Sequence, residues 1–203
     1  MRARWLVFAA GAALFLIAEL PQVEELTFDL LTIHLLQNVV LAEWAPALLA
    51  FGLPPSLGRP LAEKVPWFLA LPIWLGTYFA WHVPALYDAA LEHPDSLLHL
   101  EHATYLAAGF LFWLPVAHGP LPSGAKAGYI FAAFILCSPL GLLLALLPEP
   151  IYDFYADAPG RWGLDPLADQ QIAGVTMASE QAIVFFAAFA FYFARFLQEQ
   201  DEV

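Results

Sequence analysis

Residues 126–147 read KAGYIFAAFILCSPLGLLLALL, and this stretch decides the class of fold. Its one charged side chain is at the first position, Lys126, and a run of about 17–25 apolar residues has the length that crosses a bilayer as a helix. The rest of the chain is similar, since hydrophobic residues make up 61% of its 203 residues and charged residues 13%. Soluble domains carry about 25% charged residues. The sequence therefore predicts an all-α integral membrane protein.

Six apolar segments predict a bundle of six transmembrane helices that forms a single domain over residues 1–203. The predicted spans cover residues 5–20, 28–53, 65–82, 96–118, 126–147 and 169–197. Loop-like stretches separate them, such as GLPPSLGRP at 52–60 and HGPLPSGAK at 118–126. The first span begins like a signal peptide, with basic residues before a short apolar core. Because no small-x-small cleavage site follows, we expect this span to be retained.

The basic residues predict the orientation of the bundle, because cytoplasmic loops carry an excess of Lys and Arg. With the N-terminus in the cytoplasm, the inner side holds six of the seven basic residues, namely Arg2, Arg4, Arg59, Lys64, Lys126 and Arg195. The outer side holds only Arg161, together with a rim of carboxylates that attracts cations. We therefore expect a multi-pass protein of the plasma membrane with both termini in the cytoplasm.

Four of the six histidines lie in one stretch, WHVPALYDAALEHPDSLLHLEH at 81–102. The predicted topology places His82 at the outer end of the third span. His99 and His102 fall in the first two turns of the fourth span and, being three residues apart, share a helix face. His34 lies about two turns into the second span, which also starts outside. Polar groups in spans are costly unless paired and indicate function by default, so a histidine cluster near the outer surface is predicted.

Histidines in this arrangement favour a metal site. Neutral imidazole suits Cu, Zn, Fe and Ni, and a thioether selects Cu(I). Met177 is about two turns into the last span, near the expected depth of His34. We predict that one metal ion is bound by three histidines, with His82 or Met177 as a further ligand. The three histidines are His34, His99 and His102.

Other polar residues are assigned supporting or structural roles. Asp88 and Glu101 could orient an imidazole by accepting its second N–H, and Asn38 is placed beside the ligands. His93, in a polar loop, and His118, at an inner helix end, are predicted to have no role in the site.

Glu43 and Glu180 fall near the middle of the predicted spans, where a charge costs about 2.5–3.5 kcal/mol. We expect them to be protonated, or hydrogen-bonded to each other or to Asn38, and to join helices rather than to carry protons or ions. The single Cys137 lies in an apolar run, where a small buried hydrophobe is expected.

Five motifs resemble the CtaG family, which are membrane assembly factors required for active copper-containing cytochrome c oxidase. They are HLLQN at 34–38, WHVPALYDAAL at 81–91, HLEH at 99–102, LFWLPV at 111–116 and DQQIAGVTM at 169–177. The resemblance implies copper handling on the outer side, with an oxidase subunit and a copper donor protein as partners. It carries the family histidines over to His34, His82, His99 and His102. The chain departs from the family pattern at Asn38, where a second histidine is usual, and at Glu43 and Glu180; family members also often have a seventh span.

Three functions follow from these residues. The leading one is an assembly factor that binds copper near the outer surface and hands it to an oxidase subunit. A haem-binding redox protein would use two histidines as axial ligands. A membrane metalloenzyme, with zinc for example, would add a general base such as Asp88 or Glu101. No complete catalytic motif is found, so an enzyme is not predicted, and no basic run indicates nucleic acid as a partner.

Overall fold

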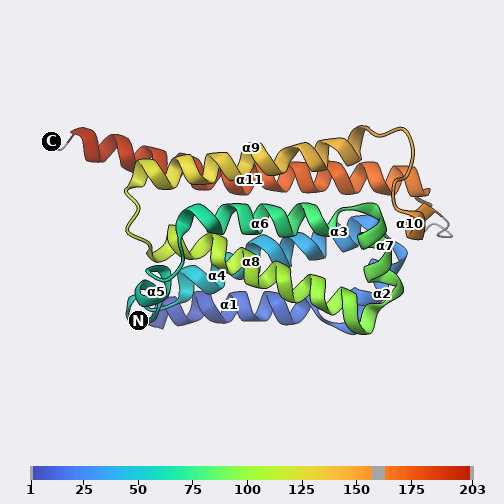
Figure 1. Ribbon diagram of the computed structural model, residues 1–203, viewed down its shortest axis with the longest axis horizontal. Coiled ribbons are helices and arrows are strands. Elements are labelled where there is room, and N and C mark those ends of the chain that lie inside the picture. Colours follow the sequence, from blue (N-terminus) through green and yellow to red (C-terminus); the bar gives the residue numbers. More distant parts are fainter. Residues whose placement is uncertain (1, 157–162, 202–203) are drawn as a thin grey trace.

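The computed structural model describes residues 2–156 and 163–201, and these residues form helices and no strand (Figure 1). The elements that run along the long axis are α1 (Arg2–Ala18), α6 (Trp67–Trp81), α8 (His99–His118), α9 (Ser123–Leu146), α11 (Pro166–Asp201), and one rod made of α3 (Leu31–Val39) and α4 (Ala45–Gly52). A π-helical turn, η1 (Val40–Trp44), joins α3 to α4 within this rod. The short elements are α2 (Pro21–Asp29), α5 (Pro55–Ala62), α7 (Pro84–Glu92), η2 (Pro94–Leu98) and α10 (Asp153–Ala156).

The predicted helical class is confirmed, and each of the six predicted segments contains a long helical element. The predicted loops are partly wrong. The stretch 52–60 includes most of α5, and α7 and η2 occupy the connection between the third and fourth predicted spans. These three elements begin at Pro55, Pro84 and Pro94. Proline is favoured at the first position of a helix, where its missing N–H would have no partner, so these prolines start short helices in the connections between the predicted spans.

Three described stretches are long and apolar enough to cross a membrane: Leu31–Gly52, Ser123–Leu146 and Pro166–Asp201. The pair α1 and α2 qualifies as a fourth if its 55° bend lies within one span. Helix α6 is apolar but has 15 residues, which reach about 22 Å across a hydrocarbon core of about 30 Å. A multi-pass membrane protein is therefore supported, while six spans remain a prediction.

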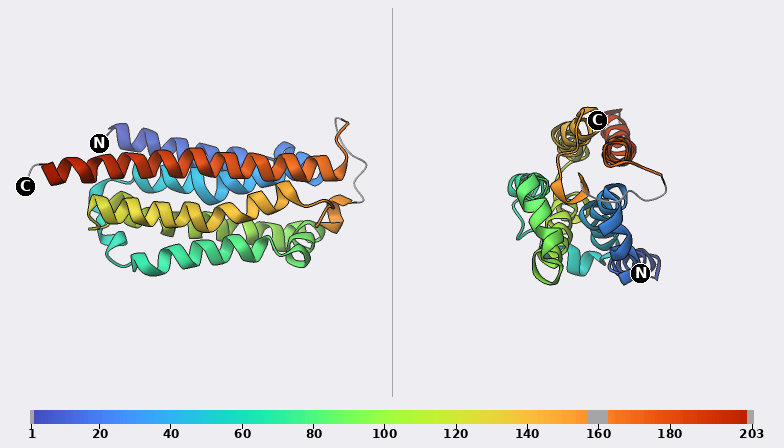
Figure 2. Two further views of the ribbon diagram at one scale, coloured as in Figure 1. Left: turned by 90° about the horizontal axis from the view of Figure 1, so that it is seen from above. Right: turned by 90° about the vertical axis from the view of Figure 1, so that its right-hand side faces the viewer.

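The helices form a bundle with an aromatic centre. Seen end-on in Figure 2, α9 and α11 lie side by side, next to a group that includes α1, α3, α6 and α8. Gly174 lets α9 and α11 approach closely, since a Cβ there would lie 2.4 Å from the backbone nitrogen of Ala145; small residues are typical of such contacts in membranes. In the centre, the rings of Trp74 and Phe112 stack with centroids 4.7 Å apart. The outer faces are apolar, with Ile183 71% exposed for example, as expected for contact with lipid.

The two ends of the bundle differ in chemistry. Both termini lie at one end, and α2, α7 and α10 lie at the other (Figure 1). Arg4, Arg59 and Lys126 line one hollow at the end that holds the termini. The sequence predicted that the basic residues and both termini lie on the same side, and these positions agree with that. Which side of the membrane this is stays a prediction. Arg161 is outside the described residues.

Candidate functional site

The site lies near the end of the bundle that carries α2, α7 and α10, and it begins with the start of α3. The backbone N–H groups of Leu31 and Thr32 donate to the carboxylate of Asp169, at 2.6 and 3.1 Å. The first N–H groups of a helix have no partner within it, and a carboxylate there also complements the helix dipole. A side chain of α11 therefore caps α3 and fixes His34 in the first turn of that helix.

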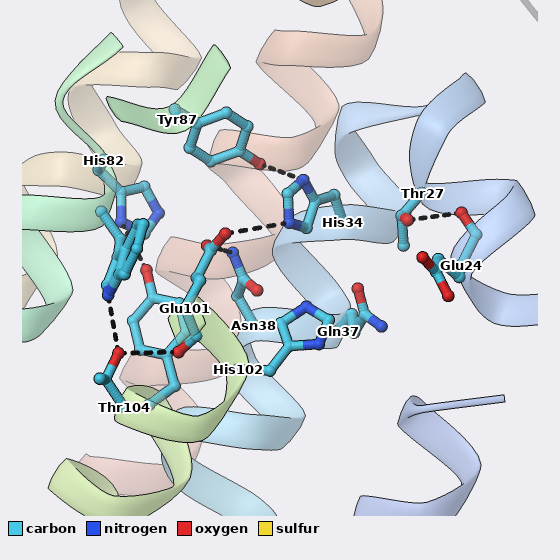
Figure 3. Close-up of polar contacts among 12 residues, drawn as sticks. Glu24, Thr27, His34, Gln37, Asn38, His82, Tyr87, Glu101, His102 and Thr104 are labelled. Carbon is cyan, nitrogen blue, oxygen red and sulfur yellow. Dashed lines mark hydrogen bonds and ion pairs between the residues drawn. The ribbon is translucent and has the colours of Figure 1, made fainter. Parts of the chain in front are cut away.

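His34 is fully buried, and two tyrosine hydroxyls contact one side of its ring; that of Tyr87 is drawn in Figure 3. Its Nδ1 atom lies 3.1 Å from the Tyr155 hydroxyl and 2.9 Å from the Tyr87 hydroxyl. The Tyr155 hydroxyl donates its own proton to the carbonyl of Thr27, at 2.5 Å, so toward His34 Nδ1 it can only accept, whereas the Tyr87 hydroxyl could donate to an unprotonated Nδ1. We adopt the tautomer in which Nδ1 donates to Tyr155. It leaves Nε2 with a lone pair, the form in which imidazole binds a metal.

Glu101 lies opposite that lone pair. Its Oε2 atom is 3.9 Å from Nε2 of His34, and its Oε1 accepts a hydrogen bond of 2.9 Å from the side-chain amide of Asn38. Within the described part of the chain, Nε2 of His34, Oε2 of Glu101 and Oδ1 of Asn38 have no hydrogen-bond partner. Buried polar atoms without a partner are rare and need an explanation. These three atoms therefore define the candidate site.

His99 and His102 do not join His34 around one point. His99 is exposed, whereas His102 is 4% exposed and pairs through Nδ1 with Glu19 Oε1 at 2.9 Å. Two residues three apart differ by about 60° around a helix, which separates these two environments. Among the described residues, no group of three or more His, Cys, Asp or Glu side chains could hold a metal ion. The structure thus does not bring His34, His99 and His102 together, and metal binding by these three residues stays a prediction.

His82 and Met177 line a second small hollow, of about 10 Å³, together with Asn38 and Glu43. His82 Nδ1 lies 2.7 Å from the carbonyl of Tyr78, so it donates there and leaves the lone pair on Nε2. This Nε2 has no partner in the described chain. The Met177 sulfur accepts from the Tyr78 hydroxyl at 3.4 Å. The hollow is therefore lined by an imidazole and a thioether, whereas the sequence predicted each of them as an alternative further ligand beside His34, His99 and His102.

Asp88 has a different role from the predicted one. Its carboxylate accepts the backbone N–H groups of Asp153 and Phe154, both at 3.2 Å, so it fixes α10 rather than an imidazole. Partial burial raises the pKa of Asp88, and the two N–H groups oppose that rise. Because Tyr155 belongs to α10, Asp88 acts on His34 only through that helix.

The mid-bundle carboxyl groups have neutral partners from neighbouring helices. Glu43 accepts from the side chain of Gln181 at 3.4 Å, and Glu180 accepts from the indole N–H of Trp44. Asn38 contacts Glu101 instead of either of them. Both residues are therefore hydrogen-bonded, but to Gln181 and Trp44 rather than to Asn38, and the two carboxyl groups also interact with each other. These contacts join α11 to η1.

His93 and His118 lie outside the site. His93 is exposed, and its Nδ1 is 3.0 Å from the carbonyl of Ala89. His118 ends α8 near the opposite end of the bundle, where Nε2 is 2.9 Å from the carbonyl of Ala50. That neither residue takes part in metal binding stays a prediction.

The sequence did not identify Tyr87, Tyr155 or Asp169 as parts of the site. Tyr87 lies in the WHVPALYDAAL motif, in which His82 was the residue assigned to the site. Asp169 is the first residue of the DQQIAGVTM motif, in which Met177 was the residue assigned to the site. Tyr155 lies 121 positions from His34, and no spacing rule connects residues so far apart. Asp169 is 4% exposed, and a buried carboxylate needs partners. Because its burial is visible only in the fold, the sequence offered no signal for its role.

A family model described as the cytochrome c oxidase caa3 assembly factor matches residues 1–199 of the chain. Neither the comparison with curated proteins nor that with solved structures gives a match.

Proposed function

The chain belongs to the family of cytochrome c oxidase caa3 assembly factors, and from this premise we propose that it binds copper and passes it to an oxidase subunit. The family supports the assembly role. Copper binding is our proposal, and it rests on one arrangement: the lone pair of His34 Nε2 facing the unpartnered Oε2 of Glu101 across 3.9 Å.

The separation of these two atoms suits a single ion between them. Metal–nitrogen and metal–oxygen bonds are about 2.0–2.2 Å long, so one ion can bridge two ligand atoms up to about 4.2 Å apart. An ionised Glu101 would also offset the charge of a cation in an apolar surrounding, where an isolated charge is very costly. His34 donates its second N–H to Tyr155, which is the arrangement that orients metal-binding histidines.

A site with only two protein ligands favours transfer over storage. The remaining coordination positions stay open to an incoming ligand from a receiving subunit. His82 Nε2 and Met177 sulfur form a second, softer pair that would favour Cu(I). We propose this pair as a further copper position. Asn38 connects it to the position between His34 and Glu101, because Asn38 lines the hollow and donates a hydrogen bond to Glu101.

The size of the hollow favours an ion over haem. The space beside His82 and Met177 is about 10 Å³, close to the minimum for one water molecule. Pockets for larger organic ligands measure about 300–1,000 Å³. We further propose that this end of the bundle faces outward from the plasma membrane, and that a copper donor protein supplies it from that side. The uneven distribution of basic residues supports the orientation.

The experiment is a deletion strain grown at limiting copper. Oxidase made without this protein should contain haem but lack copper and activity, and a plasmid carrying the wild-type gene should restore both. The same plasmid with His34→Ala should fail, whereas one with His93→Ala should succeed, with both proteins present in the membrane at equal levels. Normal oxidase copper in the deletion strain would reject the assembly role. Full rescue by His34→Ala would reject only the proposed site.

A further inference from the structure

At the opposite end of the bundle, four basic side chains face one hollow of about 430 Å³. They come from four separate elements: Arg4 from α1, Arg59 from α5, His118 from the end of α8 and Lys126 from α9. One acidic residue, Glu63, also lines the hollow. The positive-inside rule explains why basic residues occur at this end. It does not require residues from four elements to surround the same space.

Contacts with the backbone hold two of these side chains in place. One terminal nitrogen of Arg4 donates to the carbonyls of Leu53 at 2.9 Å and Phe51 at 3.4 Å, at the end of α4. The ring of His118 lies over Gly58, where an added Cβ would come within 2.3 Å of it. Its Nε2 donates to the carbonyl of Ala50. The side chains of Arg4 and His118 are therefore preorganised around the hollow, because contacts with α4 and α5 hold them rather than contacts with each other.

The positive charges lack compensation at close range. Among the residues that the structure describes, neither Arg59 nor Lys126 forms an ion pair, although Glu199 acts on Lys126 from farther away. Arginine provides planar pairs of N–H donors that match phosphate oxygens, and lysine adds a point charge. Basic pockets at the cytoplasmic end of membrane helices are suited to anionic headgroups.

The surroundings indicate that the phosphate comes from a lipid. In α5, Leu57 and Leu61 are 51% and 42% exposed, and a spacing of four places them on one face of the helix. A short helix with exposed leucines beside Arg59 suits the boundary between headgroups and acyl chains. We propose that this hollow binds the phosphate headgroup of an anionic phospholipid, with the acyl chains against the apolar face of α5.

The test is thermal unfolding of the purified full-length protein in detergent, with added lipid. Phosphatidylglycerol should raise the melting temperature in a saturable way, because a ligand that binds the folded state stabilises it. Phosphatidylcholine, and inorganic phosphate at equal ionic strength, should have little effect. Arg59→Gln should weaken the apparent affinity for phosphatidylglycerol about fivefold. The matched control is Lys64→Gln, which removes the same charge from an exposed residue that does not line the hollow.

Several outcomes would overturn the proposal. Equal stabilisation by both lipids would show that no headgroup is recognised, and equal losses in Arg59→Gln and Lys64→Gln would show diffuse attraction instead of a site. An effect of inorganic phosphate as large as that of phosphatidylglycerol would assign the hollow to a soluble anion. If Arg59→Gln does not fold, the anionic lipid that copurifies with wild type and with Lys126→Gln is compared instead by mass spectrometry of the extracted lipids. Equal anionic lipid in both would contradict the site.

Discussion

Nε2 of His34 lies 3.9 Å from Oε2 of Glu101, in a place where both side chains are fully buried. The two residues come from different helices, α3 and α8, and each is held by other contacts. Tyr155 and Tyr87 surround Nδ1 of His34, and Asn38 binds Oε1 of Glu101. The two facing atoms are therefore kept apart by the fold at a separation that one metal ion can bridge.

Glu101→Gln should weaken copper binding at least about tenfold, because it removes the negative charge and keeps a similar shape. Copper affinity is measured by competition with a chelator of known affinity. The control is Glu92→Gln, the same change at an exposed position of α7, and it should bind copper as wild type does. Equal affinities for Glu101→Gln and wild type would remove Glu101 from the site.

His99→Ala should change copper affinity by no more than about twofold, since surface substitutions away from a site have small effects. This prediction follows from the exposure of His99. It is the opposite of the expectation from the sequence, in which His99 is a metal ligand. The same competition measurement tests it, beside His34→Ala as the positive control. If His99→Ala loses as much affinity as His34→Ala, helix α8 must turn when copper binds.

Tyr155→Phe should weaken copper binding about tenfold, because groups that orient a metal-binding histidine have effects of about 10–100-fold. The substitution removes the oxygen that accepts His34 Nδ1–H and donates to Thr27. Tyr129→Phe is the matched control, since Tyr129 is buried and donates to a backbone carbonyl, that of Phe112. Similar melting temperatures with different copper affinities are expected; equal affinities would show that Tyr155 does not orient the imidazole.

Asp169→Ala should lower the free energy of unfolding by about 2 kcal/mol, as expected for loss of a helix cap and of hydrogen bonds to a charged group. It should also weaken copper binding, because the start of α3 positions His34. Denaturant or thermal unfolding gives the stability. Asp201→Ala, an exposed position at the end of the same helix, should change neither property. Unchanged stability in Asp169→Ala would mean that α3 does not depend on this cap.

The sequence predicted the helical class and most helix positions, because apolar runs such as residues 126–147 leave few alternatives. It also placed His34 and His82 near the outer ends of their spans as candidate ligands, while their burial is known only from the fold. It could not separate His99 from His102, since an amphipathic pattern is weak in a helix that has apolar residues on all sides. Asp88 and Glu101 looked alike as acidic residues near the outer end. Only the fold shows that one fixes α10 and the other faces His34.

The short helices were missed for a related reason. Pro55, Pro84 and Pro94 are typical of turns and are also favoured at the first position of a helix, and the segments after them are too short for periodicity to decide. The network around His34 depends on Tyr155 and Asp169, which lie more than 120 positions away in the chain. Such contacts arise from tertiary packing, and no local pattern reports them.

The central claim is that His34 holds copper in this protein, and copper content tests it most directly. Wild type, His34→Ala and His93→Ala should be purified without a metal-binding tag from cells grown with copper, and their copper measured by elemental analysis. We predict that wild type and His93→Ala contain copper and that His34→Ala contains almost none, although all three are folded and have similar helix content. A His34→Ala protein with as much copper as wild type would contradict the account.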